Sequence, residues 1–243
     1  MSVSLVCLPP AGGSAVMARG WRAHLDPDVR IHPANPRRAA ARAGTTDLVT
    51  VAEALVADLP EPPYVVVGHS LGGLLGLELV HAAARVGAPA PAGLVVMGSR
   101  PPQAGTADLF APLLDLDDDA LVTALVGLGA LTPGAAASAA RALFLPGLRA
   151  DLRLVAGYRP ARGLPGPVAV PLEVWHGVDD PVAPPRLAPL WWPCAASQLV
   201  LRRFRGDHDF PTSHAPAVAA ALDAVVRRWV PSRTSRLADV LVP

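Results

Sequence analysis

The segment Gly68-His69-Ser70-Leu71-Gly72 has the clearest chemical potential in the chain, because its serine is flanked by glycines in a Gly-X-Ser-X-Gly pattern. An apolar run typical of a strand, Tyr64 to Val67, precedes it, and leucines at helical spacing follow it. A serine in such a strand-to-helix turn has its hydroxyl lifted above the sheet, and side chains at the glycine positions would collide with neighbouring elements. The pattern also occurs by chance, but this context favours Ser70 as a nucleophile.

A serine hydroxyl is a weak nucleophile at neutral pH, so it needs a base within hydrogen-bond reach and an acid that orients the base. Serine, acid and histidine in that chain order form one known arrangement. After Ser70, two runs typical of strands are each followed by a polar loop, Gly177 to Pro181 and Gly206 to Phe210. We therefore predict His208 as the base. Two other histidines are interpreted as structural, at a strand end and at the start of the last helix: His176 and His214.

The orienting acid is expected in the loop after Gly177. Asp180 is favoured because it precedes Pro181, which restricts its backbone to an extended geometry suited to reaching across a loop. Asp179 is the competing residue, and Asp207 is interpreted as part of the structure of its loop. His69 is expected to point away from the side of Ser70 on which a substrate would react, and to have a packing role or make a supporting hydrogen bond.

A negatively charged oxygen that develops during attack needs two backbone donors. The residue after the nucleophile, Leu71, is expected to supply one N–H group. The loop after the first strand is expected to supply the other from Ala11, since Gly12 and Gly13 allow this loop to approach closely. The alternative interpretation is that Pro9 to Gly13 is only a connector between a strand and a helix.

The elements around these residues alternate between strands and helices, which predicts an α/β fold with a mostly parallel central sheet and helices on both faces. Ligands bind at the carboxyl ends of the strands in such folds. The length of 243 residues fits a single domain over residues 1–243. Six apolar runs are predicted as strands: Val3 to Leu8, Val29 to His32, Tyr64 to Gly68, Gly93 to Met97, Val170 to His176 and Gln198 to Leu201.

Helices are predicted from about Ala15 to Leu25, after the capping-box spacing of Thr50 and Glu53, and from Ala215 to Trp229. Pro36 to Gly44 is interpreted as a solvated loop. Between about 103 and 165 only helical spacing remains, which predicts an inserted helical lid or subdomain that we expect to cover the pocket at Ser70. The tail Pro231 to Pro243 is ambiguous. The leucines of the insertion form three groups: Leu109, Leu113, Leu116; Leu121, Leu125, Leu128; and Leu143, Leu148, Leu152 with Val155.

Composition excludes several classes of function. The net charge is +1 with acids and bases interspersed, which is unlike a nucleic-acid binder or a polybasic membrane anchor. The first strand-length run follows no basic segment, so neither a signal peptide nor a spanning helix is expected, and we predict a cytoplasmic monomer. Cys7 and Cys194 are far apart, without metal-like spacing, and Cys7 reads as a buried residue of the first strand. No metal, cofactor or disulfide is expected.

Five segments together resemble one family: Leu5 to Ser14, Gly68 to Gly73, Leu145 to Asp151, Gly177 to Pro181 and Gly206 to His208. They are similar to those of the type II thioesterases, α/β hydrolases that accompany polyketide synthases and nonribosomal peptide synthetases. The resemblance runs from about Leu5 to Trp229. It implies an α/β-hydrolase fold with Ser70, Asp180 and His208 as the catalytic triad. It also implies hydrolysis of acyl groups, chiefly stalled or misprimed short units, from the phosphopantetheine arm of an acyl or peptidyl carrier protein.

Two positions depart from the family pattern. Where members usually carry Pro-Gly-Arg after the second strand, this chain has Pro36-Arg37-Arg38, which is expected to alter the loop near the pantetheine entrance. Where an aromatic residue usually follows the histidine, this chain has Asp209, which adds a charge beside the base. Neither departure removes a member of the predicted triad.

Other functions compete with hydrolysis of a carrier thioester. An acyl-serine intermediate also serves a cyclase, an acyltransferase or a general carboxylesterase, and the sequence hardly separates these. A carrier-binding module without activity is disfavoured by the intact triad. Arginines expected near the site mouth are predicted to meet an acidic carrier protein, although they would also solubilise a protein without lysine: Arg37, Arg38, Arg42 and Arg100.

Overall fold

The computed structural model describes residues 2–136, 141–160 and 166–231 of the chain. Its centre is a six-stranded sheet in the order β2-β1-β3-β4-β5-β6, with every neighbouring pair parallel. Each predicted strand is present, so the predicted parallel α/β architecture is confirmed. The strands are β1 (Val3–Leu8), β2 (Val29–Pro33), β3 (Tyr64–His69), β4 (Leu94–Met97), β5 (Leu172–Gly177) and β6 (Leu199–Phe204).

The strand order creates a crevice at one edge of the sheet. The chain leaves β1 toward β2 on one side and leaves β3 toward β4 on the other, although β1 and β3 are neighbours. The loops after these two strands therefore separate at the carboxyl edge, which is where ligands bind in open α/β sheets. This topology brings the loop after β1 beside Ser70, where Pro10 and Ala11 line one pocket with the serine.

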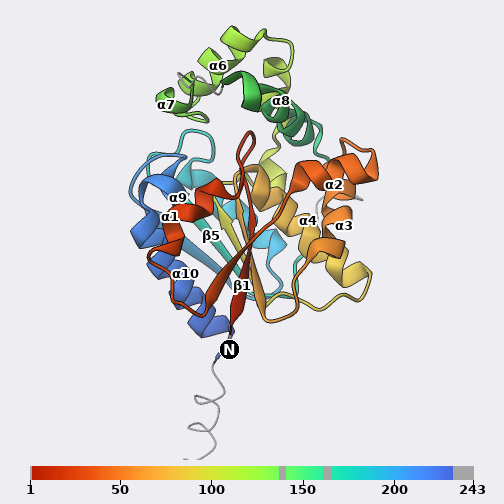
Figure 1. Ribbon diagram of the computed structural model, residues 1–243, viewed down its shortest axis with the longest axis vertical. Coiled ribbons are helices and arrows are strands. Elements are labelled where there is room, and N and C mark those ends of the chain that lie inside the picture. Colours follow the sequence, from red (N-terminus) through yellow and green to blue (C-terminus); the bar gives the residue numbers. More distant parts are fainter. Residues whose placement is uncertain (1, 137–140, 161–165, 232–243) are drawn as a thin grey trace, which may run out of the picture.

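Helices cover both faces of the sheet (Figure 1). One face carries α1 (Arg19–Arg22) and α10 (Ala215–Trp229), which pack through Trp21 and the apolar stripe of α10. The other carries α2 (Pro36–Ala43), α3 (Leu48–Leu55) and α4 (Leu71–Arg85). The strands β1, β3 and β4 lie between two apolar layers, and this explains their continuous apolar sequences.

The segment Pro36 to Gly44 is a helix, so its interpretation as a loop was wrong. Asn35 caps the helix by accepting a hydrogen bond from the N–H of Arg38 at 3.0 Å. Pro36 takes the first helical position, and Gly44 ends the helix with a φ of 61°. These boundary signals outweigh the polar composition on which the prediction rested.

Two other helix boundaries also differ from the prediction. The helix expected from Ala15 to Leu25 is a short 3₁₀ turn, Ala15–Ala18, followed by the single turn of α1. The helix α3 begins after Asp47, whose carboxylate accepts from the N–H of Thr50 at 2.8 Å, so Thr50 is not the capping residue. A proline-rich 3₁₀ helix, Pro185–Cys194, precedes β6 and was not predicted.

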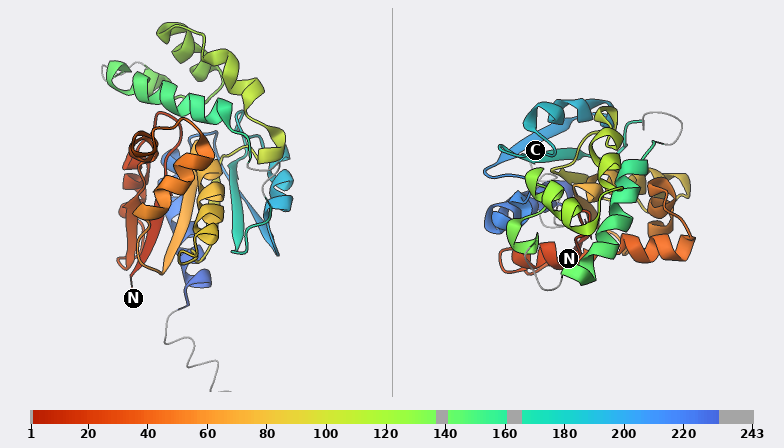
Figure 2. Two further views of the ribbon diagram at one scale, coloured as in Figure 1. Left: turned by 90° about the vertical axis from the view of Figure 1, so that its right-hand side faces the viewer. Right: turned by 90° about the horizontal axis from the view of Figure 1, so that it is seen from above.

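Within the described residues, only helices and turns occur between β4 and residue 157, and we call residues 102–157 the helical insertion. Figure 2 shows α8 lying across the carboxyl end of the sheet. The expected burial of the leucine groups holds in full or in part for all members except Leu143, which is 84% exposed. The elements are η3 (Pro102–Ala104), α5 (Ala107–Phe110), η4 (Ala111–Leu113), α6 (Asp118–Gly127), α7 (Pro133–Ala136) and α8 (Arg141–Gly157).

The two cysteines are buried and free, and the expected burial of Cys7 is confirmed. Cys7 lies in β1, and burial raises the pKa of its thiol to about 12. The tail after Pro231 lies outside the described residues. Across the described part of the chain, no helix is both long and apolar enough to cross a membrane.

Candidate active site

Ser70 lies in the strained turn between β3 and α4, with φ 54° and ψ −116°. It is the one residue other than glycine with a positive φ among the described residues. A Cβ atom at Gly68 would lie 2.0 Å from the carbonyl oxygen of Gly72, and one at Gly72 would lie 2.2 Å from that of Leu8. The two glycines are therefore required by the close approach of the β3–α4 turn to itself and to β1.

His208 lies between Ser70 and Asp180. Its Nε2 atom is 3.0 Å from Oγ of Ser70, and its Nδ1 atom is 3.0 Å from Oδ2 of Asp180. Because a carboxylate only accepts, Nδ1 carries the proton and Nε2 is free to accept the hydroxyl proton of Ser70. The three residues come from the loops after β3, β5 and β6, so the parallel sheet brings them together across the chain. The arrangement can activate the serine for attack on a carbonyl carbon.

The Asp180 carboxylate is held by its own loop. Oδ1 accepts hydrogen bonds from the N–H groups of Val182 and Ala183, both at 2.9 Å. Burial alone would raise the pKa of this carboxyl. The hydrogen bond and charge of His208, together with the two N–H donors, outweigh burial and keep the pKa of Asp180 below its usual value. Asp180 therefore stays ionised beside His208.

His69 supports His208 from behind. Its Nε2 atom is 2.9 Å from the carbonyl oxygen of His208, and the two rings lie 4.9 Å apart. A carbonyl oxygen only accepts, so Nε2 of His69 carries the proton. Burial lowers the pKa of His69 to about 3, so the ring is neutral. The expected supporting hydrogen bond is present, although the ring also lines the outer pocket described below.

The competing residues lie away from Ser70. Asp179 is exposed, and Asp207 is exposed with its carboxylate accepting from the N–H of Asp209 at 3.0 Å. His176 is buried in β5, and His214 is the capping position of α10. The structure thus brings together the predicted set and none of its competitors.

The loop after β1 approaches Ser70 as expected. Ala11 lines a pocket together with Ser70 and His208. The N–H of Leu71 is in the first turn of α4, where no acceptor is available inside the helix. For the N–H of Ala11, no hydrogen bond is found within the described residues. Both predicted donors are therefore available to a ligand oxygen.

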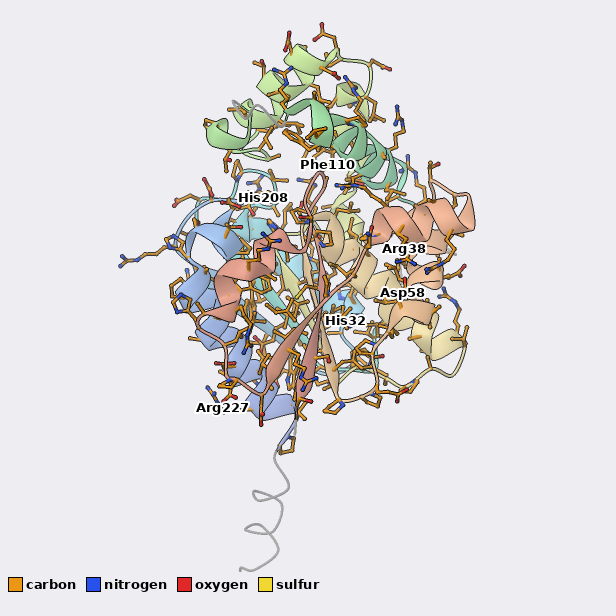
Figure 3. The ribbon with its side chains drawn as sticks, viewed as in Figure 1. His32, Arg38, Asp58, Phe110, His208 and Arg227 are labelled. Carbon is orange, nitrogen blue, oxygen red and sulfur yellow. The ribbon has the colours of Figure 1, made fainter. Side chains whose placement is uncertain are left out.

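Two pockets meet at His208. An inner pocket of about 30 Å³ contains Ser70, and its walls are apolar residues of the helical insertion, Leu125, Leu152 and Val155 among them. An outer pocket of about 300 Å³ extends from His208 past Gly12. Figure 3 shows Phe110, which lines the inner pocket, on the side of the insertion that faces the sheet, with His208 near it at the carboxyl end of the sheet.

The predicted arginines differ in their contacts. Arg37, at the first departure from the family pattern, pairs with Asp151 of α8 at 2.7 Å. Arg42 pairs with Asp58 at 2.9 Å, and Arg100 donates to the carbonyl oxygens of Ala104, Gly105 and Val182. Arg38 is exposed. Three of the four guanidinium groups thus already have partners within the chain.

Asp209, at the second departure, lines the outer pocket beside His208. It is half-buried, and this burial raises the pKa of its carboxyl, with the negative charge of Asp207 acting in the same direction. A charge at this position therefore faces the space outside His208. Among the described residues, no group of three or more potential metal ligands is found.

The parallel sheet, the strained serine turn and the Ser70–His208–Asp180 contacts define the α/β-hydrolase class of proteins. The sequence matches the thioesterase domain model over residues 3–226, and the chain belongs to this family. The predicted family is thereby confirmed.

Named relatives agree with this assignment. The chain is 31% identical over 227 residues to a probable cadicidin biosynthesis thioesterase from Streptomyces griseus, covering 89% of this chain and 60% of that relative. RedJ, a thioesterase of the prodiginine pathway in Streptomyces coelicolor, is 30% identical with a TM-score of 0.79, covering 92% of this chain and 86% of RedJ. The type II thioesterase BorB of the borrelidin cluster is 26% identical with a TM-score of 0.78, covering 93% and 94%.

One contact near the site was not predicted from sequence. Asp151 of α8 accepts a hydrogen bond from the N–H of Gly12, 139 residues earlier in the chain. Asp151 ends one of the segments that resemble the family, but nothing in its spacing points to the loop after β1. The available signal in the sequence was an acid at the same helical spacing as Leu148, Leu152 and Val155.

Proposed function

We propose that this protein is a serine thioesterase that hydrolyses acyl groups from the phosphopantetheine arm of acyl or peptidyl carrier proteins. The observation that carries the proposal is the hydrogen-bonded series Ser70, His208, Asp180 beside an apolar inner pocket. Membership of the thioesterase family supports the thioester as the bond that is cleaved. The pathways of RedJ and BorB support a role in natural-product biosynthesis.

The first half of the reaction forms an acyl enzyme. Oγ of Ser70 attacks the thioester carbon while Nε2 of His208 takes the hydroxyl proton. The N–H groups of Ala11 and Leu71 stabilise the oxyanion. Collapse of the tetrahedral intermediate breaks the carbon–sulfur bond, and His208 gives its proton to the departing thiolate. Asp180 holds the imidazole tautomer and stabilises the imidazolium.

The second half returns the free enzyme. His208 takes a proton from water, which attacks the acyl carbon of Ser70. The same two N–H groups stabilise the second oxyanion, and Ser70 leaves with the proton from His208. The products are a carboxylic acid and a carrier protein with a free thiol.

The two pockets support separate binding of the acyl group and of the pantetheine arm. The inner pocket of about 30 Å³ suits a short acyl group, in agreement with the editing of stalled or misprimed units. The outer pocket of about 300 Å³ continues from His208, which protonates the leaving thiolate in this proposal, and it suits the pantetheine arm. The helical insertion acts in this proposal as the lid over the acyl group.

Docking of the carrier protein is proposed at basic residues beside the loop after β1. A surface hollow of about 980 Å³ borders this loop at Pro10 and Gly13, and Arg19, Arg22 and Arg30 line it. Arg38 is exposed on the neighbouring helix α2. Such rim charges act on encounter with an acidic partner more than on the chemical step.

The test is mass spectrometry of the protein after incubation with a panel of acyl-loaded carrier proteins. We expect acyl-Ser70 and free acid from the wild-type protein, and Ser70→Ala should reduce turnover by at least about 10³-fold. Ser197→Ala, at an exposed serine away from the pockets, is the matched control. Wild-type turnover by Ser70→Ala would refute the proposal. Cyclised or transferred products in place of free acid would identify a cyclase or an acyltransferase.

Docking is tested separately with Arg38→Glu. We expect a higher KM for the acyl carrier protein at low salt and little change for acyl-N-acetylcysteamine. Arg227→Glu is the control, since Arg227 is an exposed arginine at the opposite end of the molecule (Figure 3). Equal KM values for both variants on the carrier would remove Arg38 from the docking surface.

A further inference from the structure

Asp151 is a buried carboxylate outside the set that contacts Ser70. It lies on α8 of the helical insertion, and its side chain is only 4% exposed. Its Oδ2 atom accepts a hydrogen bond from the N–H of Gly12 at 2.8 Å. A side chain of the insertion therefore holds the loop that contains the proposed oxyanion donor, Ala11.

Arg37 of α2 completes this contact. Its Nη2 atom donates to Oδ2 of Asp151 at 2.7 Å, and its Nε atom lies 3.2 Å from Oδ1. Nη2 also donates to the carbonyl oxygen of Gly13 at 3.0 Å. We call Asp151 and Arg37, with the peptide groups of Gly12 and Gly13, the clasp. Together the two side chains fix an N–H and a C=O group of the loop.

The clasp acts on a particular peptide group. The N–H of Gly13 donates to the carbonyl oxygen of Pro10 at 2.9 Å, so Pro10 to Gly13 form a β-turn with Ala11 and Gly12 at its centre. Gly12 has a φ of 70°, which is the type II pattern. Types I and II differ by a flip of the central peptide, and the N–H of that peptide belongs to Gly12. Asp151, as its acceptor, selects the type II orientation and with it the position of Ala11.

The same face of α8 forms the wall of the acyl pocket. Leu148, Asp151, Leu152 and Val155 are three, four and seven residues apart and share one side of the helix. The three apolar members line the inner pocket with Ser70. A movement of α8 therefore changes the pocket wall and the loop position together.

Packing around the clasp is tight on both sides of α8. A Cβ atom at Gly12 would lie 2.9 Å from Cδ1 of Leu148, and one at Gly147 would lie 2.9 Å from Cζ of Arg37. The loop and the guanidinium group therefore touch α8 directly. The positive charge of Arg37 also offsets the Asp151 carboxylate, which would otherwise oppose a negative charge developing near Ala11.

We propose that Asp151 is a positioning residue for the oxyanion hole. Through Asp151, the position of α8 in the helical insertion determines the placement of the Ala11 N–H. This inference rests on the proposed function, in which Ala11 donates to the oxyanion. The clasp makes the site competent only when α8 lies against the loop.

The test compares Asp151→Ala and Asp151→Asn with Arg149→Gln. Arg149, also on α8, pairs with Asp118 of α6 and has no contact with the loop, so it is the matched control. For a short acyl-N-acetylcysteamine we expect kcat to fall about 10- to 100-fold in Asp151→Ala, below the loss of a whole oxyanion donor, with little change in KM. Asp151→Asn should lose less, because its amide oxygen can still accept from Gly12. The kcat of Arg149→Gln on this substrate should stay within about twofold of the wild-type value.

A second readout separates positioning from general damage. Oγ of Ser70 adds to the carbonyl carbon of an alkyl trifluoromethyl ketone and forms a hemiketal. The pKa of the hemiketal hydroxyl can be followed by ¹⁹F NMR. A weaker oxyanion hole raises that pKa, so we expect an increase in Asp151→Ala and none in Arg149→Gln. Should Asp151→Ala fail to fold, the isosteric Asp151→Asn still has to show the raised pKa.

Two results would overturn the inference. Hemiketal pKa and kcat values in the folded Asp151 variants equal to those of Arg149→Gln would show that Asp151 only supports packing, while the activity of the wild-type protein would leave the proposed function intact. A wild-type protein that neither hydrolyses thioesters nor forms a hemiketal at Ser70 would refute the proposed function, and this inference with it.

Discussion

The carboxyl edge of the sheet and the helical insertion contribute to one site in different ways. Ser70, Asp180 and His208 lie within four residues of the ends of parallel strands, and hydrogen bonds from backbone N–H groups hold their loops. The insertion contributes apolar pocket walls, and two of its ion pairs, Arg149–Asp118 and Arg141–Asp119, lie at the surface, while Asp151 of the Asp151–Arg37 pair is buried. Surface pairs contribute about 0–1 kcal/mol each. The comparison contrasts loops fixed at the ends of a buried sheet with an insertion that adds apolar walls and is held partly by surface ion pairs.

The largest expected effect tests the loops at the end of the sheet. Asp180→Asn should reduce kcat about 10³- to 10⁴-fold, because the amide favours the wrong imidazole tautomer and cannot stabilise the imidazolium. Asp179→Asn, at the exposed neighbour, should stay within about twofold. Steady-state kinetics on one thioester compares the two. Equal and mild losses would assign the acid to another residue, with Asp207 the next to examine.

Hydrogen exchange compares the two parts directly. Amides of α6 and α8 should exchange at least about 100-fold faster than those of β3, because local opening of the insertion needs less free energy than opening of the core. A covalent acyl analogue on Ser70 should slow exchange in the insertion and leave β3 unchanged. An insertion protected as strongly as β3, and insensitive to the analogue, would make it part of the core.

Burial of His69, which lies against His208, should make the free energy of unfolding depend on pH. The folded pKa of His69 is about 3 and its ordinary value is 6.5, so the unfolded chain binds more protons between these values and stability falls as pH falls below 6.5. The loss from pH 7.5 to pH 5 is about 2 kcal/mol for this group. Urea unfolding should show a smaller loss in His69→Asn.

The control for this prediction is His24→Asn, at an exposed histidine, which should follow the wild-type protein. Burial also lowers the pKa of His81 and His176. The stability that these two histidines lose as pH falls is the same in every variant. Asp180 has a lowered pKa and loses its contribution only below its unfolded value, near pH 4. A parallel fall in wild type and His69→Asn would mean that His69 is not a neutral group in the native protein.

The smallest expected effect concerns the pocket wall. Leu125→Ala should enlarge the inner pocket and shift the ratio of kcat/KM for octanoyl over acetyl thioesters by about 10-fold, the scale of one or two methylenes. Leu154→Ala is the matched control, since Leu154 is as deeply buried in the insertion but does not line the pocket. An equal shift in both variants would indicate general loosening of the insertion.

The sheet and the Ser70 site were predictable because each signal is local. Most strands are short apolar runs, and Ser70, Asp180 and His208 each lie within four residues of a strand end. Parallel topology then brings the strand ends together without further information from the sequence. The misassigned segment from Pro36 to Gly44 also had local signals, Asn35 before it and Gly44 after it, but polar composition was given more weight.

The insertion was less predictable because its contacts are not local. Leucine spacing indicates helices but not which side faces the sheet, and Leu143 proved to be exposed. Asp151 and Arg37 are 114 residues apart, and their ion pair depends on how α8 lies across the sheet. Spacing along the chain carries no information about such a contact.

The backbone of Ser70 has a consequence for protein engineering. A serine at φ 54° stores about 1–3 kcal/mol of strain, whereas glycine adopts this conformation freely. Replacement of Ser70 by glycine should therefore yield a more heat-resistant protein without a nucleophile. A screen for thermal tolerance alone would enrich inactive molecules at this codon, so directed evolution of this chain has to score turnover alongside melting temperature.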